Sequence, residues 1–289
     1  MMRSLWTAAS GMSAQQLQVD TISNNLANVN TTGYKRERQE FSTLFYDTLN
    51  RANLDPANPP GRPVNLQVGL GVRPVATTRY FNQGSLQRTD RPLDVALNGP
   101  GFFMVRRSYM TDDNEIIGYT RDGAFQVSPN EDGELMIVTA LGFPILDIEG
   151  EPVVLPSVED GGPPTDSHII IGLQGIITWM DPEAEDNSVI THDQQIAVVR
   201  FPNQQGLEGI GNNLFVSTAA AGEPIMLATD PPGFFPASSG INQGVLEMSN
   251  VNIATEMISL ITSQRAFELN SRAISTSDQM LQEAVNLRR

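Results

Sequence analysis

The chain has 289 residues, a net charge of −15 and no cysteine. The lack of cysteine excludes disulfides, thiolate metal sites and iron–sulfur clusters, and two histidines leave little material for a histidine-based site. Phosphate binding needs clustered Lys and Arg, so the acidic balance argues against nucleic acid as a partner.

The net charge is unevenly distributed along the chain. Residues 1–40 carry four basic and three acidic side chains, and residues 241–289 carry four basic and five acidic ones, so the two ends together are neutral. The whole charge of −15 therefore lies in residues 41–240. Neutral ends can crowd together in many copies while an acidic middle keeps an assembly in solution. Acidic linkers alone explain the pattern equally well.

The first 34 residues are predicted to form one long helix. Two mainly apolar rows recur every seven positions, which is typical of a coiled-coil seam. The rows are Leu5, Met12, Val19 and Leu26, and Ala8, Gln15, Ile22 and Val29. The Asn, Thr and Gly of residues 28–33 are typical of a helix end. This segment also lacks the long apolar run of a membrane span or a cleaved secretory signal.

Asparagines gather near the end of this helix, at Asn24, Asn25 and Asn28. Their amides can make specific hydrogen bonds between packed subunits without adding net charge. Asparagine is also typical of helix ends and turns, so the sequence leaves both roles open.

The last segment, residues 236–289, is predicted to hold a matching helix. Neither Gly nor Pro occurs between Asn250, the predicted N-cap, and Arg289. One apolar row recurs every seven residues, at Ile253, Leu260, Phe267, Ile274 and Leu281. A strict seven-residue repeat predicts left-handed winding around a partner. A single seam hardly offsets the entropy lost in ordering both ends, so we expect them to be largely disordered in a monomer and ordered on polymerisation.

Between the helices the composition changes. Residues 35–79 read as an extended connector with a Pro-rich stretch at 51–66, which we expect to brace neighbouring subunits. In residues 80–235 short apolar runs alternate with turn signals, which predicts an outer, mainly antiparallel β domain. The apolar runs are residues 102–105, 135–138, 169–171, 176–180, 196–201 and 214–216. The predicted fold class is α+β, with long terminal coiled-coil helices flanking a central β domain.

The sequence predicts no catalytic, cofactor or metal site. Acidic runs at 112–115 and 181–186 lie in polar segments, which favours solvated loops over the paired carboxylates of a glycosidase. Residues 128–139 have calcium-loop spacing, but Ser128 and Thr139 occupy positions that normally carry acidic ligands, so a hairpin turn is favoured. Phosphate-binding, dinucleotide-binding and nucleophile-elbow motifs are absent from the sequence.

Four parts of the sequence resemble the bacterial flagellar rod and hook family of axial proteins. They are Asn-Asn-Leu-Ala-Asn followed by Thr-Gly-Tyr-Lys within residues 4–35, Leu-Asp-Val-Ala-Leu-Asn-Gly at 93–99, Tyr-Thr-Arg-Asp-Gly-Ala-Phe at 119–125, and Gln-Gly-Val-Leu-Glu at 243–247 with the helix that follows. Within the family, residues 3–12 and 71–76 are most similar to subunits of the distal rod. Residues 105–120 and 158–195 are less similar to it.

The resemblance implies a structural subunit of the distal rod and not an enzyme. Such subunits polymerise through their terminal helices into a hollow shaft that crosses the periplasm and transmits torque to the hook. The implied partners are further copies of the chain, proximal rod proteins, hook or hook–rod junction proteins, the P and L ring proteins and the flagellar type III export apparatus. The alternatives are another rod or hook protein and, more distantly, a secreted carbohydrate-active or carbohydrate-binding β domain.

Overall fold

The computed structural model describes residues 2–50, 52, 64–107, 116–130, 134–155, 169–180, 189–226 and 240–287. The chain divides into two compact units, and the backbone passes between them several times. Unit 1 comprises Met1–Ala27, Glu37–Arg79 and Asn252–Arg289. Unit 2 comprises Asn28–Arg36 and Tyr80–Val251. The division into four sequential parts made from the sequence stays a prediction.

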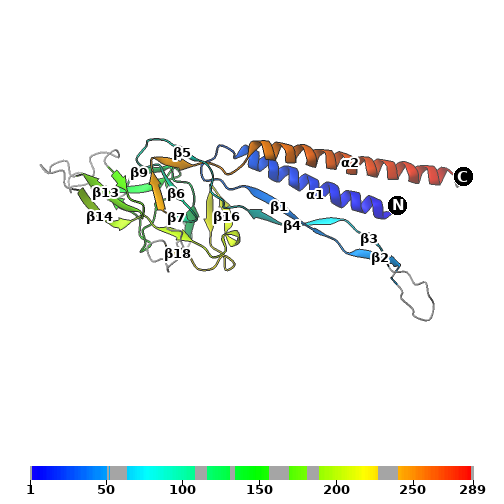
Figure 1. Ribbon diagram of the computed structural model, residues 1–289, viewed down its shortest axis with the longest axis horizontal. Coiled ribbons are helices and arrows are strands. Elements are labelled where there is room, and N and C mark those ends of the chain that lie inside the picture. The colour runs from blue at the N-terminus through cyan, green and yellow to red at the C-terminus, as the bar shows by residue number, and fades with distance from the viewer. Residues whose placement is uncertain are drawn as a thin grey trace. The chain divides into compact units, whose positions relative to one another are not determined.

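Unit 1 contains two long helices, α1 (Met2–Ala27) and α2 (Ile253–Asn286), which pack along each other (Figure 1). Helix α1 ends directly before the segment 28–33, where the sequence predicts a helix stop. The N-cap of α2 is Asn252, whose side chain accepts a hydrogen bond from the backbone N of Thr255 at 3.2 Å. The prediction of Asn250 as the cap is therefore wrong. Neither helix contains a stretch apolar enough to cross a bilayer.

The expected connector after α1 contains a two-stranded antiparallel ribbon. Strand β1 (Glu37–Thr43) pairs with β4 (Val72–Arg79), and β2 (Tyr46–Asn50) pairs with β3 (Leu66–Gly69). Backbone hydrogen bonds between these pairs make the ribbon continuous. Helix α1 contacts β1 and β4. Most of the Pro-rich stretch 51–66 lies outside the described residues, so its bracing role stays a prediction.

Unit 2 is built from short strands, and every described pairing is antiparallel, as the sequence predicts. Its largest sheet has six strands in the order β16-β17-β8-β7-β15-β18. Two three-stranded sheets have the orders β11-β10-β9 and β12-β13-β14, and two strand pairs are β19-β6 and β20-β5. The strands are β5 (Leu86–Arg88), β6 (Val95–Asn98), β7 (Phe102–Arg107), β8 (Ile116–Thr120), β9 (Phe125–Pro129), β10 (Leu135–Thr139), β11 (Val154–Leu155), β12 (Ile169–Ile171), β13 (Ile176–Met180), β14 (Val189–Gln195), β15 (Val198–Arg200), β16 (Glu208–Gly211), β17 (Leu214–Val216), β18 (Ile225–Met226), β19 (Gly240–Gln243) and β20 (Val245–Glu247).

The predicted apolar runs become strands because their side chains fill the interior of unit 2. The runs at 102–105, 135–138, 169–171, 176–180 and 214–216 are confirmed as β7, β10, β12, β13 and β17. Strands β9 and β10 pair antiparallel from Pro129 with Leu135 to Phe125 with Thr139. The strands on both sides of the predicted hairpin turn therefore pair as expected, while residues 131–133 of the turn lie outside the described residues.

Strand β7 separates two apolar clusters because successive side chains of a strand point to opposite faces. Phe103 and Val105 belong to one cluster, and Phe102 and Met104 belong to the other. The second cluster is rich in aromatic rings that meet edge to face, with centroids 5.3 Å apart for Phe81 and Phe102. Such contacts contribute beyond the burial of area alone. Unit 2 thus has two apolar clusters of its own, one on each face of β7.

Candidate functional site

The chain covers the predicted interface residues of α1 more fully than those of α2. In the rows predicted for the first helix, Ala8 and Ile22 are buried, whereas Leu5, Met12, Val19 and Leu26 are half-buried. Val29 is also half-buried, but it follows the end of α1 at Ala27, so its predicted place in the helix is wrong. In the α2 row Ile253 and Phe267 are exposed, whereas Leu260, Ile274 and Leu281 are half-buried. A role of these residues between subunits stays a prediction, as does the coiled-coil winding of the helices.

A different row of residues, polar or small, lies where α1 meets α2. The contacts are Ser4 Oγ with Ser277 Oγ at 3.4 Å, Asn25 Nδ2 with Glu256 Oε2 at 3.3 Å, and Gly11 with Asn270, whose Nδ2 would lie 2.8 Å from a Cβ at position 11. From Ser4 to Gly11 the contact moves seven residues forward along α1 and seven residues back along α2, from Ser277 to Asn270. From Gly11 to Asn25 it moves fourteen residues forward along α1 and fourteen back along α2, to Glu256. The helices are therefore antiparallel. Their contact row lies one residue before the predicted apolar row on α1 and three residues after it on α2.

Asn25 is the best-connected side chain of this contact row. Its Oδ1 accepts a hydrogen bond from Glu37 N at 2.9 Å, and its Nδ2 donates to Glu37 O at 2.8 Å and to Glu256 Oε2. Both Asn25 and Glu256 are buried, and Glu256 lies in the first turn of α2, where the helix dipole favours a negative charge. Asn25 therefore joins α1, β1 and α2 within one chain.

The two neighbouring asparagines differ from Asn25. Asn28 Oδ1 accepts a hydrogen bond from Thr31 Oγ1 at 3.2 Å, which is turn chemistry. Asn24 is exposed. A role for the three asparagines between subunits stays a prediction.

Large apolar side chains lie on the outside of both the helices and the ribbon. On the helices these include Trp6, Ile258, Ile261, Leu269 and Val285, and on the ribbon Phe45, Tyr46, Leu49, Leu66 and Val75. Exposed apolar surface of this extent marks an interaction site. A two-stranded ribbon is only marginally stable by itself. Unit 1 therefore presents large apolar side chains that the chain itself leaves exposed.

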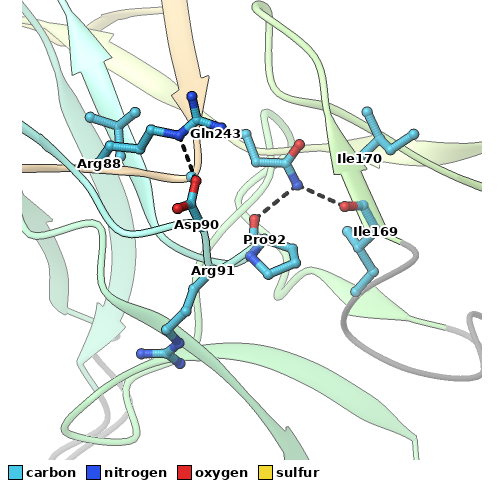
Figure 2. A pocket seen from close by; sticks show the side chains of 9 residues that line it. Arg88, Asp90, Arg91, Pro92, Ile169, Ile170 and Gln243 are labelled. Atoms are coloured by element: carbon cyan, nitrogen blue, oxygen red, sulfur yellow. Dashed lines mark hydrogen bonds and ion pairs between the residues drawn. The ribbon is translucent and has the colours of Figure 1, made fainter.

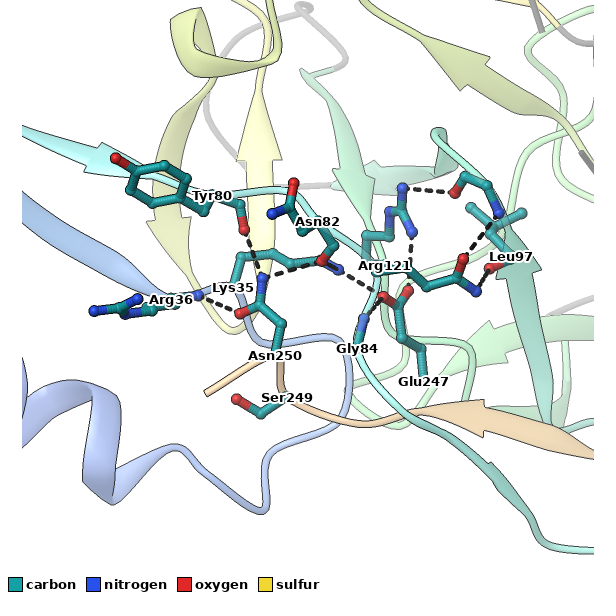
Figure 3. Close-up of polar contacts among 12 residues, drawn as sticks. Lys35, Arg36, Tyr80, Asn82, Gly84, Leu97, Arg121, Glu247, Ser249 and Asn250 are labelled. Atoms are coloured by element: carbon teal, nitrogen blue, oxygen red, sulfur yellow. Dashed lines mark hydrogen bonds and ion pairs between the residues drawn. The ribbon is translucent and has the colours of Figure 1, made fainter. Parts of the chain in front are cut away.

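In unit 2, three of the segments that carry the family resemblance meet at a buried ion cluster (Figure 3). Glu247 Oε1 accepts a hydrogen bond from Lys35 Nζ at 2.6 Å, and Glu247 Oε2 accepts one from Arg121 Nη1 at 3.0 Å. The three side chains are at most 1% exposed. Arg121 Nη2 also donates to Gly99 O at 2.9 Å, and its guanidinium lies 5.6 Å from the centre of the Phe102 ring.

The cluster contains two cations and one carboxylate. Burial, reinforced by the nearby Arg121 charge, lowers the pKa of Lys35 from 10.5 to about 8, although Glu247 acts in the opposite direction. Burial by itself raises the pKa of Glu247, but Arg121 and Lys35 outweigh it and hold that pKa below 4.5. With all three groups charged, the cluster therefore has a net charge of +1.

Two glycines of the family motifs are required by close backbone approaches around the cluster. Gly33 has φ of +67°, and a Cβ there would lie 2.7 Å from the carbonyl carbon of Arg121. A Cβ on Gly123 would lie 1.7 Å from Val95 O, in the motif at residues 93–99. The motifs thus interlock through their backbones as well as through the ion cluster.

Sequence reasoning missed this cluster. The sequence signal that could have found it is a charged residue inside each of three family motifs. These are Lys35 after Gly33, Arg121 before Gly123, and Glu247 after an apolar pair.

Asn250 organises the chain next to the cluster. Its Oδ1 accepts a hydrogen bond from Arg36 N at 2.7 Å, and its Nδ2 donates to Tyr80 O at 2.8 Å and to Asn82 O at 3.0 Å (Figure 3). The Asn250 side chain is thus bonded within unit 2, and Asn252, which directly precedes α2, caps the helix.

A shallow cavity of about 500 Å³ lies elsewhere in unit 2 (Figure 2). Gln243 Nε2 fixes two of its walls by donating to Pro92 O at 2.9 Å and to Ile169 O at 2.7 Å. The lining residue Arg88 pairs with Asp90 at 2.5 Å, and Arg91 lies 3.5 Å from Asp94. Because both arginines have acidic neighbours in the chain, the cavity offers no strong binding site for an anion. Within the described ranges, no group of His, Asp and Glu side chains is placed to hold a metal ion.

Comparison with known proteins gives matches along most of the chain. Residues 5–35 match the family described as flagella basal body rod protein, residues 96–179 match the flagellar hook protein FlgE/F/G D1 domain, and residues 242–287 match the flagellar basal body rod FlgEFG protein C-terminal family. These matches include the terminal helices and the motifs that form the ion cluster.

Relatives match over their full length. The chain is 42% identical over 292 residues to the flagellar basal-body rod protein FlgG of Borreliella burgdorferi, covering 100% of both chains. It is 41% identical over 288 residues to the protein of the same description from Buchnera aphidicola subsp. Schizaphis graminum, covering 99% of this chain and 100% of the relative. For the one from Caulobacter vibrioides the identity is 40% over 289 residues, with the same coverage. The chain therefore belongs to the family of flagellar basal-body rod proteins FlgG.

Proposed function

We propose that this chain is a structural subunit of the flagellar distal rod. Many copies polymerise through α1 and α2 into a hollow shaft, which transmits torque across the periplasm to the hook. The single observation that carries the proposal is the full-length similarity, at about 40% identity, to proteins described as flagellar basal-body rod proteins.

The surfaces of unit 1 support a role in polymerisation. The contact row between its helices is polar or small, while apolar side chains such as Ile258 and Leu269 lie outside it and are more than half exposed. Burying such side chains contributes about 1.5–3 kcal/mol each. A second copy of unit 1 offers a surface of the same chemistry, so self-association covers both.

The remaining partners belong to the same proposal. The subunit leaves the cell through the flagellar export apparatus. It then joins proximal rod proteins at one end and hook or hook–rod junction proteins at the other. Unit 2 faces the surrounding P and L ring proteins.

The test is assembly of the purified, concentrated chain, examined by electron microscopy for tubes. Leu269→Asp places a charge on the exposed apolar face of α2 and should abolish tubes. The matched control is Gln279→Asp, which adds the same charge at an exposed polar position of α2. Circular dichroism should give equal helix content for both variants when they are unassembled. Normal tubes from Leu269→Asp would contradict the proposed interface.

A further inference from the structure

Three chain segments that are distant in sequence are joined within unit 2 (Figure 3). Residues 33–36 follow α1, residues 80–84 follow β4, and residues 247–250 precede α2, and each lies beside a passage of the backbone between the units. Backbone hydrogen bonds link Gly33 N to Glu247 O at 2.8 Å and Tyr80 N to Arg36 O at 2.9 Å. All three segments are therefore held together beside the points where unit 2 continues into unit 1.

Lys35 is the side chain that connects the first of these segments to both of the others. Its Nζ donates to Asn82 O at 2.9 Å and to Glu247 Oε1 at 2.6 Å. Each acceptor also has a second donor: Asn250 Nδ2 lies 3.0 Å from Asn82 O, and Gly84 N lies 2.8 Å from Glu247 Oε1. Loss of the ammonium would therefore leave neither acceptor unsatisfied, so the main penalty of removing a buried partner does not apply.

The charge of Lys35 is the surplus charge of the cluster. Arg121 already neutralises Glu247 through Oε2, and Arg121 and Glu247 are the charged groups that act on the Lys35 ammonium. Burial and the repulsion by Arg121 disfavour the protonated form, which is why the pKa of Lys35 falls to about 8. Burial of this surplus charge carries a desolvation cost that a neutral side chain of similar length does not.

We propose that Lys35 is a positioning residue whose buried charge holds residues 33–36, 80–84 and 247–250 in a single register, at the expense of the stability of unit 2. Buried ionic groups contribute to a unique arrangement in some proteins where a neutral replacement would be more stable. The inference is independent of the proposed function because it concerns the fold of a single chain.

The test compares Lys35→Met with the wild-type full-length chain. Methionine has a similar length and no charge, so the urea midpoint of unit 2 should be equal or higher. Hydrogen exchange at the amides of Gly33, Arg36 and Tyr80 should become roughly tenfold faster or more, with exchange in β7 and β8 unchanged, because only the local register loosens. Lys35→Arg retains the charge and should keep these amides protected.

The pH dependence gives a second readout. The folded pKa of Lys35, about 8, lies below its ordinary value of 10.5. The free energy of unfolding of the wild-type chain should therefore rise as pH increases from 8 to 10.5, whereas that of Lys35→Met lacks this contribution. If the variant is the more stable at pH 8, the difference in free energy between the two should become smaller over this range.

Two results would overturn the inference. The first is a lower midpoint, or failure to fold, for Lys35→Met with faster exchange throughout β7 and β8, which would make Lys35 an ordinary stabilising member of the core. The second is unchanged exchange at all three reporter amides.

Discussion

The two units of this chain place apolar and polar side chains in opposite ways. In unit 2, Phe102 and Phe103 are 0% exposed, and the charged groups of the Lys35 cluster are sealed inside with their partners. In unit 1, buried Asn25 and Glu256 lie between the helices while Leu269 is 65% exposed. Unit 2 encloses two apolar clusters within a single copy, whereas the helices and ribbon of unit 1 leave side chains such as Trp6 and Phe45 largely exposed.

This difference means that the two units should respond differently to protein concentration. A fold that is completed by association gains stability by mass action, whereas a self-contained fold does not. The two tryptophans allow the units to be followed separately, because Trp6 lies in unit 1 and buried Trp179 lies in unit 2. A Trp6→Phe background leaves Trp179 fluorescence as the reporter of unit 2.

The largest effect is expected from Glu247→Gln. This change removes the carboxylate and leaves Lys35 and Arg121 as buried cations without an anion, which should lower the free energy of unfolding of unit 2 by about 3–5 kcal/mol. Urea unfolding followed by Trp179 fluorescence measures the change. Glu151→Gln is the control, because Glu151 forms an exposed pair with Arg106 and should change stability by about 1 kcal/mol or less. Equal effects of the two variants would contradict the role of the cluster.

The same substitution, Leu→Ala, can be made in each unit to compare their stabilities. Leu155 is 0% exposed in unit 2, so Leu155→Ala leaves a cavity and should lower the free energy of unfolding by about 2–5 kcal/mol. Leu269→Ala on α2 should change the unfolding of the unassembled chain by about 0.5 kcal/mol or less. Its effect should appear instead as a higher protein concentration needed for tubes. A large loss of single-chain stability from Leu269→Ala would contradict the contrast between the units.

Asn25→Ala tests the polar row of unit 1. The change removes the amide that pairs with the backbone of Glu37 and with Glu256, at an expected loss of about 1–3 kcal/mol in helix-pair stability. Circular dichroism at helical wavelengths during urea titration of assembled tubes gives the measurement. Asn24→Ala, at an exposed neighbouring position, should have a smaller effect. If Asn24→Ala lowers helix-pair stability more than Asn25→Ala does, the contact row has been wrongly identified.

The smallest effect is a pH dependence on the acid side. The folded pKa of Glu247 lies below 4.5, so its contribution to stability is fully present above pH 4.5 and is lost as pH falls through the folded pKa. Urea midpoints of the wild-type chain should therefore fall more steeply below pH 4.5 than those of Glu247→Gln. Parallel curves would show that Glu247 does not titrate differently in the folded chain.

The sequence predicts the helices and the antiparallel body well because both depend on local periodicity. The seven-residue spacing and the absence of Gly and Pro give α2, and the short apolar runs give strands such as β7 and β13. The contact row between the helices could not be predicted, because periodicity identifies the apolar face without saying which molecule covers it. The ribbon of β1 to β4 was also missed, because the polar and Pro-rich composition of residues 35–79 was read as an extended connector.

The ion cluster could not be predicted for a different reason. Lys35, Arg121 and Glu247 are far apart in the sequence, and charged residues in an unaligned sequence are expected at the surface. Only the fold reveals that the turn at Gly33 brings the backbone beside Arg121.

Helix α2 is longer than the partner that lies along it. Ser4 at the start of α1 faces Ser277, so residues 280–286 of α2 run past the first turn of α1. At 1.5 Å per residue this overhang is roughly 10 Å long, and it carries exposed Met280 and Val285. We propose that, in an assembly of such chains, these exposed apolar side chains of the overhang pack against a neighbouring copy.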